Sequence, residues 1–144
     1  MSRESRALWQ SWREEHLRIN LEGEILERAG HLYLLPPGLP SLAGIKAPAP
    51  GLYLGEVRVG HRKDAGRFLP GKPLAHYLQP HQVSPVLRLQ AEDPRALEFA
   101  LGQPIRAEGS EGWNWVALET AVGLFSLGWG KLKGGVLRPG KARL

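Results

Sequence analysis

The first stretch of the chain carries apolar and aromatic side chains at a helical spacing. Charged residues occupy the other positions, and the spacing predicts a helix over residues 2–17, with Ser2 or Ser5 as its N-cap. Two tryptophans on one helical face are typical of a packing stripe rather than of a ligand site, so we expect both in the core. The residues on this face, at i, i+1, i+4 and i+8, are Leu8, Trp9, Trp12 and His16.

Short apolar runs separated by turn residues come next. The runs 24–28 and 31–35 flank Ala29-Gly30 and predict a hairpin, and the proline- and glycine-rich residues 36–51 predict a loop or an extended connection. Residues 52–59 alternate between apolar and polar except at Gly55-Glu56, which predicts a strand with a bulge. A polar turn over 61–66 follows.

The second half of the chain begins with a linker and a helix. We expect a short helix over 73–78, a linker over 80–85 and a strand over 86–89. Asp93 as N-cap, Pro94 at the first helical position and Gly102 as a stop predict a helix over 94–101.

Beyond Pro104 the apolar residues are spaced by glycines and short polar turns, which predicts a meander of three to five short strands. Such a meander closes most naturally as a compact β-barrel or half-barrel. The fold class is therefore α+β, with a small mixed α+β unit over 1–83 followed by a small barrel and its flanking helix over 84–144.

Composition narrows the possible chemistry. The chain has 144 residues and no cysteine, which excludes disulfides, thiolate metal sites, iron–sulfur clusters and a cysteine nucleophile within it. No apolar run approaches the roughly 20 residues that cross a bilayer, and the first ten residues carry charges where a signal peptide is apolar. We expect a soluble, cytoplasmic protein with no membrane partner.

Patterns that would carry catalysis or cofactor binding are weak. The glycine-rich run 128–135 resembles a phosphate-binding loop, but residues 136–139 cannot open the helix that such a loop requires, so a bulge and a hairpin turn are expected there. The only clustered histidines, at 61, 76 and 81, match no zinc spacing, and no serine lies in a nucleophile elbow. We expect no active site, no metal and no cofactor, and an enzyme with an unrecognised site is the least favoured hypothesis.

Charge is distributed in blocks rather than evenly. Residues 57–88 hold six basic and one acidic residue, residues 120–144 hold five basic and none acidic, and the intervening segment 89–119 holds two basic and six acidic, within a net charge of +5. If the two basic blocks meet in space, they form a positive surface that attracts polyanions. The alternative is that both blocks are merely solvated faces.

Basic side chains interleaved with aromatics are typical of RNA-binding surfaces, because cations neutralise phosphates and an exposed tryptophan stacks on an unpaired base. Trp129 has two possible roles: in a strand it belongs to the core, and on the surface it stacks on RNA. The candidate RNA-binding residues are Arg58, Arg62, Lys63, Arg67, Lys72, Trp129, Lys131, Lys133, Arg138, Lys141 and Arg143.

Five short runs occur in an order that resembles a known family. They are Gly51-Leu52-Tyr53-Leu54-Gly55-Glu56, Arg67-Phe68-Leu69-Pro70 with Leu74-Ala75 after it, Gly112-Trp113-Asn114-Trp115-Val116-Ala117, Phe125-Ser126-Leu127-Gly128-Trp129-Gly130-Lys131 and Gly135-Val136-Leu137. Together they resemble the C-terminal region of RsmF-type ribosomal RNA cytosine-5 methyltransferases. The resemblance implies an intermediate domain followed by a PUA-like RNA-binding barrel, which coincides with the boundary near residue 83.

The chain also departs from this family. Near its C-terminus it has Arg138-Pro139-Gly140-Lys141-Ala142-Arg143, which keeps the charge of the family's terminal run but loses its aromatic residue. It also lacks the two cysteines and the cofactor-binding sheet that methylation in this family requires. The expected function is a non-catalytic RNA-binding module for ribosomal RNA, partnered by a methyltransferase catalytic domain on the same or another chain. The alternative is a protein-interaction module that docks a methyltransferase or a ribosome-assembly factor.

Overall fold

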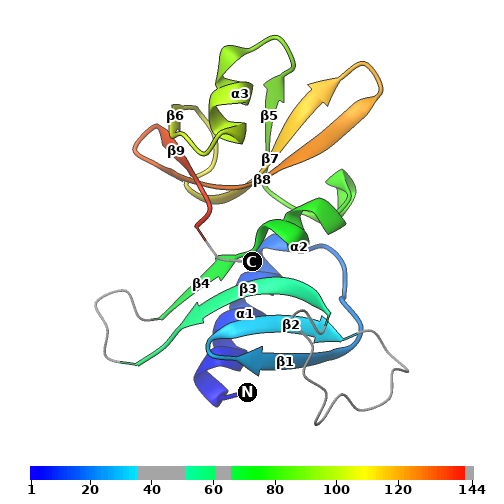
Figure 1. The fold of residues 1–144 in the computed structure, drawn as a ribbon, viewed down its shortest axis with the longest axis vertical. Coiled ribbons are helices and arrows are strands. Elements are labelled where there is room, and N and C mark those ends of the chain that lie inside the picture. The colour runs from blue at the N-terminus through cyan, green and yellow to red at the C-terminus, as the bar shows by residue number, and fades with distance from the viewer. Residues whose placement is uncertain (36–50, 61–65, 142–144) are drawn as a thin grey trace.

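The computed structural model describes residues 1–35, 51–60 and 66–141. Among these residues it has three α-helices, one 3₁₀ turn and nine strands in two sheets, so the expected α+β class is confirmed. The two sheets follow one another along the long axis of the molecule, and helix α2 lies between them (Figure 1). No helix in the described part of the chain is long and apolar enough to span a membrane.

The first helix, α1, runs from Arg3 to His16 as its apolar spacing predicts. The Ser2 side chain is the N-cap and accepts a hydrogen bond of 3.1 Å from the backbone N–H of Ser5. Trp9 and Trp12 are buried, which confirms that they belong to the core.

The first sheet has four antiparallel strands in the order β1-β2-β3-β4. They are β1 (Glu24–Arg28), β2 (His31–Leu35), β3 (Leu52–Arg58) and β4 (Arg67–Pro70). The predicted hairpin is confirmed, because Ala29 and Gly30 both have positive φ, as a tight turn between strands requires. The predicted bulge is confirmed as well: Leu32 pairs with Gly55 but Tyr33 pairs with Tyr53, which leaves one extra residue in β3.

Strand β4 is not predicted by the hydrophobic pattern. Its last three residues are all buried, so the alternation that marks a half-buried strand is absent. The strand lies close to β3, where a Cβ on Gly55 would come within 2.3 Å of the Leu69 carbonyl oxygen. The predicted loop over 36–51 and the polar turn over 61–66 lie almost wholly outside the described residues.

The connection between the sheets is packed rather than free. Helix α2 (Lys72–Tyr77) begins one residue before the predicted helix, and the expected linker contains a 3₁₀ turn, η1 (Pro80–Gln82). Val83 follows this turn, is buried and forms an isolated β-bridge with Leu17 at the end of α1.

The second sheet has five strands in the order β5-β7-β8-β9-β6. They are β5 (Val86–Gln90), β6 (Ile105–Arg106), β7 (Gly112–Thr120), β8 (Gly123–Lys133) and β9 (Val136–Pro139). The predicted meander is confirmed from β7 to β9, although β7 and β8 are long, with 9 and 11 residues. The pairing of β5 with β7 is parallel, which no local sequence pattern predicts. The sheet curls into a half-barrel, and its end strands β5 and β6 are not paired with each other.

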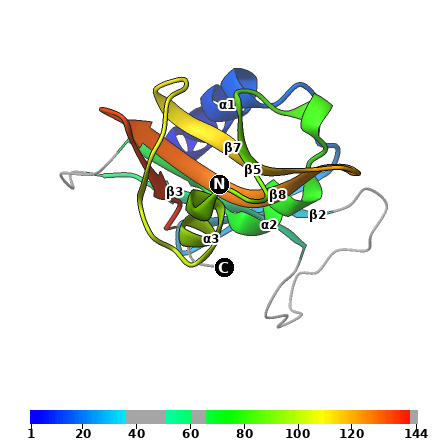
Figure 2. The ribbon, with the colours of Figure 1, turned by 90° about the horizontal axis from the view of Figure 1, so that it is seen from above.

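The two faces of the second sheet pack against different partners. One face, with Trp115 and Trp129, joins a core with α1, α2 and the first sheet. The other face, with Val116 and Leu132, joins a second core with helix α3 (Pro94–Ala100), which Asp93 caps as expected. Figure 2 shows α1 and α3 on opposite sides of β8.

Two indole N–H groups bind the second sheet to α2. Trp129 Nε1 donates to the carbonyl of Gly71, the N-cap of α2, at 3.0 Å, and Trp115 Nε1 donates to the carbonyl of Ala75, in its last turn, at 2.8 Å. A carbonyl in the last turn of a helix has no partner within the helix, so the second bond satisfies a buried acceptor. We name this pair of bonds the indole clamp. The two sheets therefore share one core, and a boundary near residue 83 between independent domains stays a prediction.

The clamp predicts which tryptophan substitutions are costly. Trp115→Phe removes the bond to the Ala75 carbonyl and leaves that buried acceptor without its donor, so it should lower the free energy of unfolding by about 1–3 kcal/mol more than Trp12→Phe. Trp129→Phe removes the bond to the Gly71 carbonyl, which still accepts from the Ala75 N–H at 3.3 Å, so its cost should be smaller than that of Trp115→Phe. Trp12 is the matched control, because it is equally buried but its Nε1 has no hydrogen-bond partner among the described residues. Urea unfolding measured by circular dichroism compares the three variants, and equal costs would contradict the clamp.

Candidate nucleic-acid interface

The two basic blocks of the sequence meet where the first sheet borders the second. Lys131 lies on β8 of the second sheet, and Arg67 begins β4 of the first. Partial burial lowers the pKa of Lys131, and the positive charges of Arg67 and Lys133 lower it further. Trp12 contacts both Phe68, the neighbour of Arg67, and Trp129, two residues before Lys131, so the two blocks lie in the same region of the molecule. The alternative that both blocks are merely solvated faces stays a prediction.

A row of side chains crosses the second sheet at this border. Lys131 is paired with Trp113 on β7 and with Arg138 on β9, and directly paired residues project from the same face of a sheet. The Lys131 ammonium lies 5.5 Å from the centroid of the Trp113 ring, within the range of a cation–π contact. Lys133, two residues further along β8, projects from the same face.

We name this cluster the junction surface and define it by Arg67, Trp113, Lys131, Lys133 and Arg138. Three of its cations are exposed, whereas Lys131 and Trp113 are half-buried. Trp113 is the member that the sequence analysis did not assign. Trp113 lies two residues before the buried Trp115, so it projects from the same, core-facing side of β7. It also lies near the beginning of the strand, which places it at the edge of the core.

Arg58 lies next to this surface but is already engaged. It pairs with Arg67 across β3 and β4, and its Nε lies 3.1 Å from Glu56 Oε1. A carboxylate beside the guanidinium cancels much of its attraction for phosphate, so Arg58 is a weaker candidate than Arg67.

The remaining predicted cations are less closely grouped. Lys72 and Lys141 are both exposed, and Lys72 lines a small cavity of about 180 Å³ together with Gly140, the neighbour of Lys141. Arg62, Lys63 and Arg143 lie outside the described residues.

Trp129 does not belong to an RNA-binding surface in this structure. Its side chain is only 3% exposed, its ring contacts Trp12 edge-to-face at 5.0 Å, and its N–H is held by Gly71. A base cannot stack on a ring that is enclosed in this way, so the assignment of Trp129 to the RNA-binding set is corrected to a core role.

The glycine-rich run 128–135 forms a bulge and a turn, as expected. The register of β7 and β8 shifts by one residue beside Gly128, which has a φ of 107°, and Gly134 and Gly135 make the tight turn from β8 to β9. No helix begins there, so the run lacks the amides that a phosphate loop directs at its ligand.

No group of three or more His, Asp or Glu side chains comes together in the part of the chain that the structure describes. That observation leaves the expected absence of a metal site a prediction.

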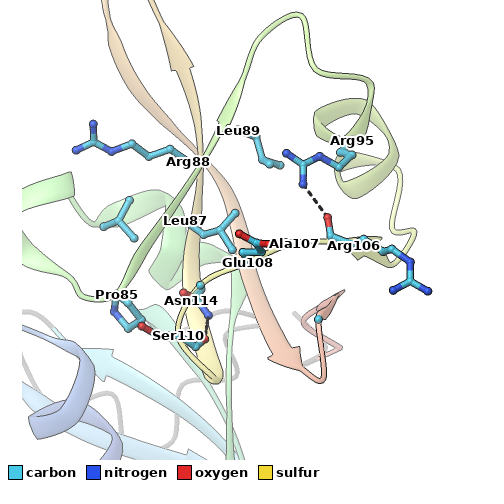
Figure 3. A pocket seen from close by; sticks show the side chains of 13 residues that line it. Pro85, Leu87, Arg88, Leu89, Arg95, Arg106, Ala107, Glu108, Ser110 and Asn114 are labelled. Carbon is cyan, nitrogen blue, oxygen red and sulfur yellow. Dashed lines mark hydrogen bonds between the residues drawn. The ribbon is translucent and has the colours of Figure 1, made fainter.

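A larger cavity, of about 680 Å³, lies in the second half of the chain, where it is lined by β5 and residues 106–110 (Figure 3). Arg95 is its most constrained side chain, because its guanidinium binds both carboxylate oxygens of Asp93 and also donates to the Arg106 carbonyl at 2.7 Å. The Asp93 partner raises the pKa of Arg95, and the guanidinium lowers the pKa of Asp93. Sequence reasoning missed this site because its arginines lie in or beside the acidic segment 89–119.

Comparisons with protein-family models identify the class and then the family. Residues 86–144, the curled half-barrel with α3, match the methyltransferase RsmF PUA domain, so this part of the chain is a PUA-like domain. Residues 11–78, which hold the end of α1, the first sheet and α2, match the first C-terminal domain of RsmF rRNA methyltransferase. The chain therefore belongs to the RsmF family and corresponds to its C-terminal region. Both matches are to accessory domains, and neither is to a catalytic one.

The meeting of the two basic blocks has a direct spectroscopic test. Replacing Arg67 by Gln removes one of the positive charges that lower the pKa of Lys131, so the pKa of Lys131 should rise. Titration of the Lys131 side chain by NMR measures this pKa. Arg3→Gln, at an exposed position on α1, is the matched control and should leave it unchanged. An unchanged pKa of Lys131 in Arg67→Gln would contradict the conclusion that the two basic blocks meet.

Proposed function

We propose that this chain binds ribosomal RNA through the junction surface, as the RNA-binding accessory part of an rRNA methyltransferase. The observation that carries the proposal is the convergence of Arg67, from the first sheet, with Lys131, Lys133 and Arg138 of the second. Membership of the RsmF family, with its PUA domain, supports the same role.

The junction surface has the chemistry of backbone recognition. Its cations neutralise phosphates and release counterions, which provides affinity without reading sequence. Trp113, half-buried beside Lys131, offers an aromatic edge at the same place. The surface would therefore recognise the path of the RNA backbone over two sheets, and a contact to bases would be secondary.

The shared core gives this surface a fixed shape. Because the indole clamp joins α2 to the second sheet, Arg67 and Lys131 are held relative to each other before RNA arrives. A preorganised arrangement of charges binds with a smaller loss of conformational entropy than one that must assemble.

In this proposal the chain positions RNA and does not perform methylation. A catalytic domain, on the same or another chain, would supply the nucleophile and the cofactor pocket. We propose the cytoplasm as the compartment in which the chain meets ribosomal RNA.

Charge reversal tests the proposal. The double variant Lys131→Glu/Lys133→Glu should bind a fluorescently labelled ribosomal RNA fragment at least tenfold more weakly at low salt, because two phosphate contacts become repulsive. Affinity of the unaltered chain should fall steeply with salt, and the slope of log K against log salt should be smaller by about 1.4–1.8 in the variant. Fluorescence anisotropy over a salt series measures both quantities.

The matched control is Arg3→Glu/Arg6→Glu, the same change in charge at exposed positions on α1. It should alter affinity much less than the junction variant. Flat salt dependence of the unaltered chain would contradict the proposal. Recovery of a protein partner after nuclease treatment, together with that flat dependence, would favour the alternative of a protein-interaction module.

A further inference from the structure

The small cavity beside Lys72 is built by both halves of the chain. Its volume is about 180 Å³. Pro70, at the end of β4, and Lys72, at the beginning of α2, line one side, and the end of α3, the bulge in β8 and residues 139–140 line the other (Figure 1). We name this space the junction pocket.

The walls of the junction pocket are held in place by hydrogen bonds and packing. The Gly71 carbonyl accepts the clamp bond from Trp129 Nε1 at 3.0 Å, and the Gly140 N–H donates to the Trp129 carbonyl at 2.9 Å. Phe99, which lines the pocket from α3, is only 2% exposed and belongs to the second core. The pocket therefore exists before a ligand enters, which lowers the entropic cost of filling it.

The accessible walls of the pocket are apolar. Ala100 is exposed, and Leu127 and Pro139 are half-buried, so a ligand can reach all three, whereas the other apolar lining residues are buried and form the floor. The volume is smaller than the roughly 300–1,000 Å³ of pockets that enclose drug-sized ligands. The pocket therefore has room for a single ring system and not for a whole nucleotide.

Cations surround the mouth of the pocket. A Cβ on Gly128 would lie 3.9 Å from Lys72 Cγ, which places the stem of this exposed lysine beside the β8 bulge. Lys141 and Arg138, both exposed, flank the lining residues 139–140. Among the described residues that line the pocket, none is acidic, so the mouth attracts an anionic ligand.

The pocket lies where β9 leaves β8. β9 pairs with β8 as far as Pro139, and the next residue, Gly140, is bonded to the Trp129 carbonyl. Among the described residues no strand lies beyond that point on this side of β8, and Leu127 and Gly128 line the pocket there. Backbone groups at an open strand edge can form hydrogen bonds with a ligand, which the polar edge of a nucleobase requires.

The junction pocket borders the junction surface. Gly140 lines the pocket, and a Cβ on it would lie 3.6 Å from the ring of Trp113. The Lys131 ammonium lies over the same ring, 5.5 Å from its centroid. An RNA backbone on the junction surface would therefore pass the mouth of the pocket about one residue away.

We propose that the junction pocket holds one unpaired nucleobase of the RNA whose backbone lies on the junction surface. The inference rests on the proposed RNA binding and adds a contact that distinguishes unpaired from paired RNA. Apolar walls enclose the base, and the cations at the mouth bind its flanking phosphates. Leu97 and Leu101, exposed on α3, make an apolar side chain of a protein the competing occupant, but the positive mouth favours a nucleotide.

An NMR titration of the full chain tests the occupant. The probes are the ribonucleoside monophosphates, and ribose phosphate, which lacks a base, is the control. The backbone amide signals of Gly102, Leu127 and Gly128 should shift with the nucleotides and not with ribose phosphate. Equal shifts with ribose phosphate, or none with any nucleotide, would overturn the inference. Shifts with N-acetyl-leucine amide alone would also overturn it and would favour a protein partner.

A substitution that fills the pocket tests its part in RNA binding. Ala100→Phe places a ring in the mouth and should weaken binding of a single-stranded RNA about tenfold, because the base loses its pocket. Binding of a blunt RNA duplex should be unchanged, since a duplex has no free base. Leu97→Phe is the matched control, at an exposed position on α3 outside the pocket, and should change neither affinity.

These measurements separate the two proposals. Unchanged affinity of Ala100→Phe for the single strand, or an equal loss for the duplex, would overturn the base pocket and leave the junction surface standing. Failure of the unaltered chain to bind either RNA would contradict the proposed function itself, and the base pocket with it.

Discussion

The structure depends on the indole clamp at the two ends of α2. Helix α2 has six residues, too short to be stable by itself, and its ends carry backbone groups that need partners. From the second sheet, Trp115 supplies the donor for the Ala75 carbonyl in the last turn, Trp129 adds a second donor to the Gly71 carbonyl, and both rings pack in the core with α1, α2 and the first sheet. One pair of side chains thus holds the short helix in place and fills the larger core at the same time.

The clamp also explains the position of the charged surface. Trp113, Trp115, Trp129 and Lys131 project from one face of the β7–β8 pair, so the same alternation that buries two tryptophans carries the row out toward solvent at Trp113 and Lys131. The lowered pKa of Lys131 is a consequence of this gradient from core to rim, because its stem is partly buried while its ammonium lies among other cations. The core positions and the positions of the proposed RNA-binding surface therefore follow one another along the same two strands.

Local patterns predicted those elements whose stability is local. The Ser2 and Asp93 caps, the Ala29-Gly30 turn and the bulge in β3 are confirmed because each depends on residues within a few positions. Strand β4 and the parallel pairing of β5 with β7 were missed, since burial by distant elements determines them. For the candidate site, the cations of the junction surface were predicted as RNA-binding residues, but the sequence did not predict that they lie together around Trp113. Trp129 shows the limit, because sequence alone left both its roles open and only its neighbours decide between them.

The segment between the two sheets has a consequence for how a large ligand is accommodated. Residues 16–18 and 82–84 form a small ladder, in which the Arg18 N–H donates to Gln82 at 2.8 Å and the Ser84 N–H donates to His16 at 2.9 Å, around the bridge from Leu17 to Val83. A hinge at this point would have to break that ladder as well as the core beside it. In the proposed role, an RNA that lies across both sheets would meet a surface of fixed shape, so the bending needed for a close fit would fall on the RNA.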